Sequence, residues 1–404
     1  MRNVFLPADI MLPKETTLEE WAVIACDQFT SQPEYWKQVY AKVGNKRSSL
    51  KMILPEAELN TADLEERAKA IHAEMEKERE LMTVYSSSYV YVERTLLDGK
   101  VRRGIVGKID LDAYDYREGS LSRIRATEKT VVERIPPRMK VRRNAVMDLP
   151  HVILLCDDAS DMILSSIEKK KEQLELLYDF ETMLNGGRIR GWLISGEHAA
   201  VLEQTIQRYE LEKRESDQNP LLYCVGDGNH SLATAKSCYE ELKASRPDQD
   251  FSEHPMRYAL VELENIRDDA QVFEPIHRVV TNTDTKALIS AAKTELADAD
   301  CGDSFCYFSG KEQGELPGGK HCVGMLQTIL DRYLEKNAGE IDYIHGEDVL
   351  REIAARDNCV GFVLPAMNKC DLFDAVQKYG VLPRKTFSMG HAQEKRYYLE
   401  SREL

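Results

Sequence analysis

The pattern of hydrophobic and polar positions is clearest in residues 221–244, where a short apolar run gives way to a helical repeat. The five apolar residues 221–225 have the length of a buried strand. Glycines on both sides of Asp227 follow, and Asp-Gly pairs favour turns. Apolar residues then recur at helical spacing at Leu232, Ala235, Tyr239 and Leu242. The pattern predicts a strand, a glycine turn and a helix capped by Asn229 or Ser231.

Other segments predict further strands and helices. Two β-rich runs, 84–96 and 101–111, flank Asp98–Gly99 and predict a hairpin. The remaining predictions are a helix at 61–82, a strand at 151–158, a charged helix at about 160–184, a strand and helix at 190–210, strands at 256–266, 273–280 and 359–368, and a surface loop at 309–321. Strands that alternate with helices indicate an α/β fold with a mixed sheet and additional antiparallel strands. We expect two lobes, a mixed α/β lobe at 1–150 and an α/β lobe at 151–404.

Composition narrows the class of protein. The net charge of −15 over 404 residues argues against a nucleic-acid binder, because a phosphate backbone would be repelled. No window approaches eighteen apolar residues, so we expect no membrane span. The nine cysteines form no CxxC pair and no signal peptide is recognisable, so we expect a cytoplasmic protein. The nine histidines lack the spacing of a zinc site.

The strand, turn and helix at 221–244 also place reactive side chains at one point. A helix that begins directly after such a turn directs unpaired backbone N–H groups and the positive end of its dipole at one spot, which favours phosphate. Asp227 and His230 lie at the mouth of this turn. An ordinary strand–helix connection with a polar tip is the alternative.

A second candidate is the basic segment 122–143, which contains eight Arg or Lys residues and two Glu. Arg125, Arg138 and Arg142 are candidate phosphate contacts, because the planar guanidinium donates two parallel hydrogen bonds. A solvated charged surface is the alternative interpretation.

The stretch VGDGNHSLATA resembles the DGHHR-type signature of the bacterial and archaeal family known as domain of unknown function 1015. That signature is similar to the phosphate-binding loop of ParB/sulfiredoxin-like enzymes, including free-serine kinases. The resemblance implies a ParB/sulfiredoxin-like core in which Gly228, Asn229 and Ser231 bind phosphate and Asp227 holds magnesium or orients His230. Asn229 stands where most members carry His, and Ser231 where they carry Arg.

Other motifs extend the resemblance over most of the chain. Residues 127–130 resemble a His-Glu-x-Thr motif, which makes Glu128 a candidate general base or magnesium ligand. FEPIHRVV at 273–280 resembles a Pro-x-His-Arg motif, so His277 and Arg278 become partners of the loop, with Arg278 on a neighbouring strand in place of the missing Arg. Lys385 belongs to the closing motif as a further phosphate contact, and His391 and Lys395 form a further basic patch in that motif. Near the N-terminus, Asp27 is a minor candidate.

These features together predict phosphoryl transfer from ADP or ATP to a small hydroxyl metabolite, with free serine as the first acceptor to try. Mg²⁺ is the expected cofactor, and Glu128 or His230 takes the hydroxyl proton. Two alternatives stay open: a phosphatase acting on a small phosphorylated metabolite such as phosphoserine, and a non-catalytic nucleotide-sensing protein. The expected partner is a small phosphorylated metabolite or nucleotide, and a homo-oligomer is left open.

Overall fold

The structure, a computed structural model, describes residues 3–30, 32–59, 63–297, 304–318 and 322–404. The chain forms two compact units. Unit 1 comprises residues 1–271 and 391–404, and unit 2 comprises residues 272–390. This division differs from the expected boundary at residue 150, because strands from both sides of that residue pair in one sheet.

Unit 1 is built on an 11-stranded sheet. The strand order is β10 (Glu175–Glu181), β11 (Arg188–Ile194), β4 (Met82–Thr95), β5 (Val101–Asp110), β13 (Tyr258–Asn265), β9 (Ile153–Cys156), β12 (Tyr223–Asp227), β7 (Ile124–Ala126) and β6 (Tyr114–Asp115), while β1 (Phe5–Leu6) pairs with β5 and β2 (Ala8–Pro13) with β4. The pairs β13–β9, β12–β7 and β6–β7 are parallel, and the other pairs are antiparallel. The predicted mixed α/β fold is confirmed.

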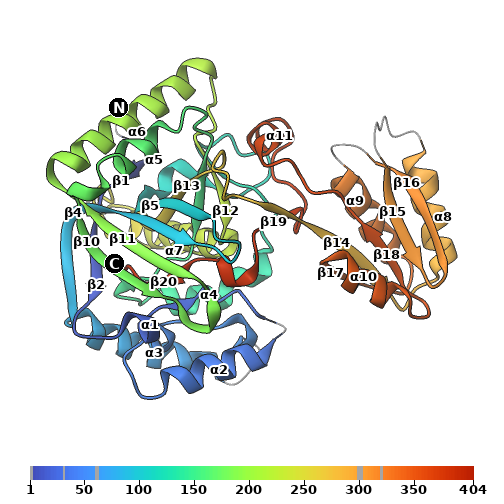
Figure 1. Cartoon of the computed structure of the whole chain (residues 1–404), viewed down its shortest axis with the longest axis horizontal. Helices are drawn as coiled ribbons and strands as arrows, with labels where there is room; N and C mark the ends of the chain where they lie inside the picture. Colours follow the sequence, from blue (N-terminus) through green and yellow to red (C-terminus); the bar gives the residue numbers. More distant parts are fainter. Residues whose placement is uncertain (1–2, 31, 60–62, 298–303, 319–321) are drawn as a thin grey trace. The chain divides into compact units, whose positions relative to one another are not determined.

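Helices cover both faces of this sheet (Figure 1). Successive residues of a strand point to opposite faces. Accordingly, Tyr89 and Tyr91 of β4 belong to the core under α5 (Met162–Glu168), α6 (Gly196–Ser216) and α7 (Asn229–Ser245). Val90 and Val92 belong to the other core, with α1 (Leu18–Trp21), α2 (Pro33–Val43) and α3 (Leu64–Arg79). Helix α4 (Ile135–Arg142) contacts both α3 and α7.

The last residues of the chain complete unit 1. Strand β20 (Tyr397–Tyr398) pairs with β3 (Val23–Ile24), and β21 (Arg402–Glu403) pairs with β8 (Met147–Asp148). Arg396, directly before β20, is buried and forms ion pairs with Glu262 and Glu400. These contacts fix the position of the neighbouring residue Lys395 within unit 1.

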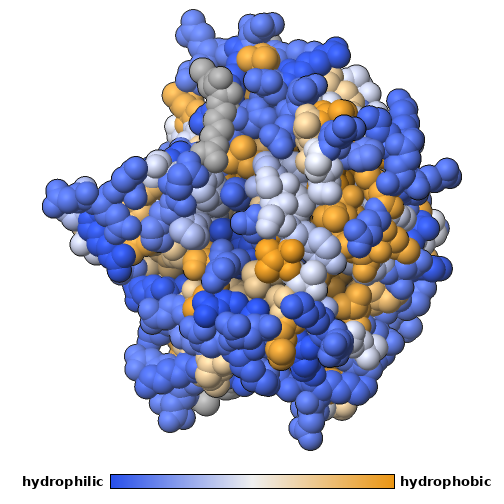
Figure 2. All heavy atoms as spheres, turned by 90° about the vertical axis from the view of Figure 1, so that its left-hand side faces the viewer, coloured by the Kyte–Doolittle hydropathy of each residue, from blue (hydrophilic) through white to orange (hydrophobic). Residues whose placement is uncertain are grey.

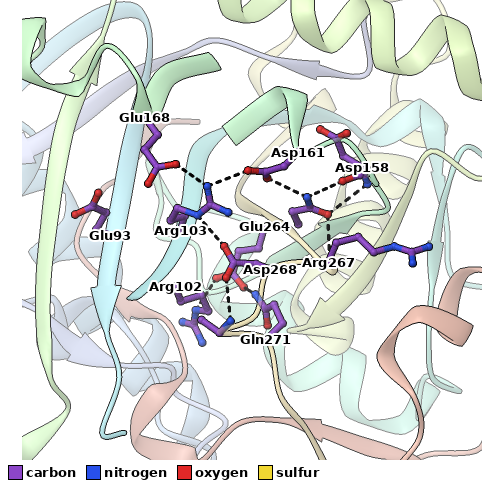
Figure 3. Close-up of polar contacts among 12 residues, drawn as sticks. Glu93, Arg102, Arg103, Asp158, Asp161, Glu168, Glu264, Arg267, Asp268 and Gln271 are labelled. Atoms are coloured by element: carbon purple, nitrogen blue, oxygen red, sulfur yellow. Dashed lines mark hydrogen bonds and ion pairs between the residues drawn. The ribbon is translucent and has the colours of Figure 1, made fainter. Parts of the chain in front are cut away.

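A buried polar cluster lies at the end of β13 in unit 1 (Figure 3). Glu264 is fully buried, with Arg102 Nε 3.0 Å from its Oε1 and Gln271 donating to its Oε2. Arg103 continues the cluster through ion pairs with Asp268, Asp161 and Glu168 at 2.8–3.0 Å. Burial raises the pKa of Glu264 to about 7, against the lowering effect of Arg102. The carboxyl group of Glu264 therefore titrates near neutral pH.

Unit 2 contains a six-stranded sheet in which all pairs are antiparallel. The order is β16 (Glu312–Pro317), β15 (Ser304–Ser309), β18 (Val360–Val363), β14 (Phe273–Thr281) and β17 (Glu340–His345), with β19 (Phe387–Met389) also paired to β14. Helices α8 (Thr285–Leu296) and α9 (Cys322–Leu334) share its main core. Helices α10 (Glu347–Ala354) and α11 (Leu372–Tyr379) complete the unit.

Two element predictions are wrong. The charged segment 160–184 forms α5 and then β10, since the alternating residues 178–181 suit an edge strand better than a helix. The predicted loop at 309–321 contains β16, which forms a hairpin with β15, while 319–321 lie outside the described residues. The hairpin of β4 and β5 across Asp98–Gly99 is confirmed.

The described residues include no helix long and apolar enough to cross a membrane. On the face shown in Figure 2, hydrophobic residues lie in groups between hydrophilic ones that cover most of the periphery.

Candidate phosphate-binding site

The turn between β12 and α7 requires glycine at position 228. Gly228 has φ +81° and ψ 26°, a left-handed conformation that residues with a Cβ rarely adopt. A Cβ at this position would also lie 3.1 Å from both Cα and Cγ2 of Val152. Gly228 is itself the N-cap, and no side chain among the described residues caps this end, so the prediction that Asn229 or Ser231 caps α7 is wrong. Both residues lie in the first turn, where backbone N–H groups have no partner within the helix.

Asp227 ends β12 and lies beside a lysine from the far end of the chain. Nζ of Lys395, a residue only 5% exposed, is 3.6 Å from Oδ1 of Asp227. The other carboxylate oxygen, Oδ2, is buried and accepts no hydrogen bond from any described residue. A buried positive charge and an unsatisfied carboxylate oxygen thus meet at the start of α7.

A short chain of hydrogen bonds connects Asn229 to the segment that follows β7. Thr127 Oγ1 donates to the carbonyl of Val225 at 2.6 Å, and Asn229 Nδ2 donates to Thr127 Oγ1 at 3.4 Å. Oδ1 of Asn229 is buried and has no hydrogen-bond partner within the described part of the chain.

The unsatisfied oxygens of Asp227 and Asn229 are candidate ligands of the expected magnesium ion. Mg²⁺ prefers oxygen ligands and is usually held by one or two carboxylates together with substrate phosphates. Oδ2 of Asp227 and Oδ1 of Asn229 are hard oxygen donors of this kind. Among the described residues, no three His, Cys, Asp or Glu side chains gather as a metal site. The donor set therefore fits an ion that a phosphate helps to hold.

His230 ties the loop to the segment that contains Glu128. Its Nε2 accepts a hydrogen bond from the backbone N–H of Val131 at 3.2 Å. Nε2 therefore carries no proton in this arrangement, and the proton of a neutral ring is on Nδ1. This contact gives His230 a positioning role that competes with its predicted role as proton acceptor. Glu128 lies half-buried in the same segment.

A cavity of about 120 Å³ lies beside the first turn of α7. Its polar wall contains Ser231, Thr234, Arg138, Arg142, His151 and Tyr398. Arg138 forms an ion pair with Glu56, which also lines the cavity. The structure thus brings Ser231 and two of the three predicted arginines to one cavity.

Arg142 is held by a buried carboxylate. Its Nη1 donates to Oδ1 of Asp148 at 2.6 Å, and Oδ2 of Asp148 accepts from Leu260 N–H and pairs with Arg402. Although burial raises the pKa of Asp148, Arg142 and Arg402 lower it to about 2. Asp148 is therefore ionised at neutral pH.

The cavity also includes residues that the sequence did not single out. The hydroxyl of Tyr398 hydrogen-bonds to Nδ1 of His151 at 2.6 Å, and Nε2 of His151 lies 3.7 Å from Oδ2 of Asp27. Burial raises the pKa of Cys26, another wall residue, to about 12, consistent with a core thiol rather than a nucleophile. His151 and Tyr398 carried no motif signal, because it is the pairing of β20 with β3 that brings Tyr398 beside Cys26.

Four predicted site residues are not among those that line the cavity or form the turn. Arg125 donates to the carbonyls of Ser122 and Asn219 and is not part of the cavity wall. His277, Arg278 and Lys385 belong to unit 2, not to the unit that carries the loop. The expectation that Arg278 lies on a strand neighbouring the loop is wrong, because β14 pairs with β17, β18 and β19 and not with β12.

Inside unit 2, the His-Arg pair is used in packing. His277 is buried and its Nδ1 accepts from the backbone N–H of Leu364 at 3.1 Å, while burial lowers its pKa. Arg278 is fully buried and donates to the carbonyls of Ile276 and Arg384 and to Gln327. Lys385 is exposed.

The fold and the site define an α/β protein. In its central sheet, strand β12 ends in a glycine turn that leads directly into helix α7. Residues 7–402 match the family described as "Protein of unknown function (DUF1015)", and the chain belongs to that family. The resemblance drawn from the loop motif is thereby confirmed. A comparison with curated proteins finds no match.

Several solved structures are similar to this chain at low identity. A free serine kinase in complex with AMP is 12% identical with a TM-score of 0.40, covering 72% of this chain and 90% of that one. A mutant free serine kinase in complex with ADP is 12% identical with a TM-score of 0.41, covering 73% and 91%. A conserved hypothetical protein from Pyrococcus furiosus is 13% identical with a TM-score of 0.36, covering 74% and 94%.

Proposed function

We propose that unit 1 transfers a phosphoryl group from ADP or ATP to the hydroxyl group of a small metabolite. The observation that carries the proposal is the meeting of three features at the start of α7. These are the uncapped first turn after Gly228, the buried ammonium group of Lys395 and the carboxylate of Asp227. Phosphoryl transfer needs positioning and charge neutralisation more than covalent chemistry, and this set of groups suits both tasks.

Each group has a role in the proposal. The backbone N–H groups of Asn229 to Ser231 and the ammonium group of Lys395 bind the phosphate. Asp227 and Asn229 would hold Mg²⁺ through their unsatisfied oxygens, and the ion supplies charge neutralisation to the phosphates when bound. Glu128 is the proposed acceptor of the hydroxyl proton, because Nε2 of His230 is engaged by Val131.

The test is to incubate the full chain with Mg²⁺, ADP or ATP, and a panel of small hydroxyl metabolites that includes serine, and to follow products by phosphorus NMR. Transfer to one acceptor supports the proposal, and the Asp227→Asn variant should lose it. Asp248→Asn changes an exposed carboxylate after α7 and is the matched control, which should transfer at the normal rate.

Two other results would replace the proposal. Release of phosphate from phosphoserine without a nucleotide would make the protein a phosphatase. Nucleotide binding without any turnover would indicate a sensor.

A further inference from the structure

The cavity beside Ser231 is small and has one largely apolar side. Its apolar wall includes Met52, Ile53, Leu54, Met75, Val141 and Met147. An apolar cavity of about 150 Å³ holds benzene, a molecule of six heavy atoms, so about 120 Å³ suits a molecule of about that size. The space matches a small metabolite better than a whole nucleotide.

The polar side of the cavity contains two buried donors without acceptors in the described part of the chain. Nε and Nη2 of Arg142 are buried, and neither finds a hydrogen-bond acceptor among the described residues. The third nitrogen, Nη1, donates to Oδ1 of Asp148. Buried donors without acceptors are unfavourable, and a carboxylate accepts two parallel hydrogen bonds from one guanidinium.

The acids of the cavity wall are already paired. Glu56 forms an ion pair with Arg138, and Asp148 is shared by Arg142 and Arg402. With Arg402, which lies behind the wall, three guanidinium groups face these two carboxylates, so both carboxylates have guanidinium partners and one positive charge is left over. This balance favours an anion over a zwitterion such as serine.

We propose that this cavity binds a small hydroxycarboxylate that lacks an ammonium group, with Arg142 as the ligand of its carboxylate. This reassigns Arg142, which the sequence predicts as a phosphate contact. Ser231 belongs both to the cavity wall and to the first turn of α7, so a molecule held by Arg142 lies beside the proposed phosphate site. The role of this hydroxycarboxylate as phosphoryl acceptor rests on the proposed function, whereas its binding to Arg142 does not.

Titration calorimetry on the full chain without nucleotide tests the inference with four probes. Glycerate carries the hydroxyl and carboxylate groups, serine adds an ammonium group, glycerol lacks the carboxylate, and inorganic phosphate is a competing anion. We expect glycerate to bind at least tenfold more tightly than the other three, since a charge-assisted contact is worth about a factor of ten or more. Equal binding of glycerol, or tighter binding of serine or phosphate, would overturn the inference, as would no binding of glycerate.

Three variants locate the binding. Arg142→Lys keeps the charge beside Asp148 but loses the planar fork, and it should weaken glycerate binding at least tenfold. Ala145→Leu fills the cavity without changing Arg142 and should weaken it as well, so a folding defect of the first variant would not decide the result. Arg143→Lys, at an exposed neighbour paired with Glu241, is the matched control and should bind normally. Normal glycerate binding by the folded Arg142 and Ala145 variants would overturn the inference.

Failure of the kinase proposal and failure of the cavity assignment give different results. If glycerate binds through Arg142 but no nucleotide binds or reacts, the cavity assignment stands and the kinase proposal fails. If phosphoryl transfer occurs while glycerate neither binds nor accepts phosphate, the kinase proposal stands and the cavity assignment fails.

Discussion

Gly228 shows how one residue sets the geometry of the site. It combines a positive φ with a close approach to Val152, and each of these alone disfavours a side chain. The turn that results exposes the first turn of α7 directly after Asp227. The glycine therefore serves both the fold and the proposed phosphate site.

We predict that Gly228→Ala destabilises unit 1 and weakens nucleotide binding. The left-handed conformation costs about 1–2 kcal/mol for alanine, and contact with Val152 adds to this. Gly99→Ala is the matched control, since Gly99 has φ +84° but open space around its Cβ position. Denaturant unfolding should show a larger loss for Gly228→Ala than for Gly99→Ala. Equal losses would mean that the contact with Val152 has no energetic effect.

Lys395 is the residue whose role depends most on tertiary structure. We predict that Lys395→Met lowers ADP affinity at least tenfold, because a charge-assisted phosphate contact contributes about 1.5–3 kcal/mol. Lys243→Met, at the exposed far end of α7, is the control and should bind ADP normally. Titration calorimetry measures both. An unchanged affinity in Lys395→Met would leave Lys395 with only a structural role beside Asp227.

At the scale of elements, the cluster on β13 makes stability depend on pH. Glutamate has a pKa of about 4.3 in unfolded chains, whereas burial raises that of Glu264 to about 7. Between these values the folded state binds more protons than the unfolded state, so stability falls as pH rises. The stabilising contribution of protonated Glu264 is thus present below about pH 4 and is lost as pH passes about 7.

We predict that Glu264→Gln removes this part of the pH dependence, on the order of 1–3 kcal/mol between pH 5 and 8. Urea unfolding at several pH values measures it, with Glu172→Gln as an exposed control. If the variant keeps the slope of the wild type, then Arg102 holds Glu264 ionised throughout this range.

The accuracy of the sequence predictions also varied between elements. The strand at 221–225, the helix after it and the β4–β5 hairpin were predictable because their signals are local: an apolar run, a helical period and an Asp-Gly turn. The segment 160–184 was not, since its charges resemble those of a helix while the edge position of β10 tolerates charged residues in a strand.

The candidate site was predictable only in part for the same reason. Asp227 to Ser231 are consecutive, so a motif reveals them. The closing motif includes Lys395 in a basic patch, but no local pattern indicates the strand pairing of the last residues that brings Lys395 and Tyr398 to the site. The unsatisfied donors of Arg142 are likewise a property of the packed structure, not of the sequence.

At the scale of the whole molecule, unit 2 is an insertion between two parts of unit 1. Phe273 pairs with Met389, and Gly390 N–H donates to the carbonyl of Val272 at 3.0 Å. The two ends of unit 2 are therefore adjacent, and a short connection can replace it.

We predict that a chain in which a short Gly-Ser linker replaces residues 272–390 folds as unit 1 and still binds ADP. Circular dichroism and cooperative unfolding check the fold, and calorimetry checks binding. A folded chain that no longer binds ADP would show that His277, Arg278, Lys385 or other residues of unit 2 are required.

A crystal structure of the full chain with ADP and Mg²⁺ would show directly whether the start of α7 binds phosphate. We predict that oxygens of the terminal phosphate lie about 2.7–3.2 Å from the backbone nitrogens in the first turn of α7 and from Nζ of Lys395. A nucleotide whose phosphates lie away from Gly228 to Ser231 would contradict this prediction.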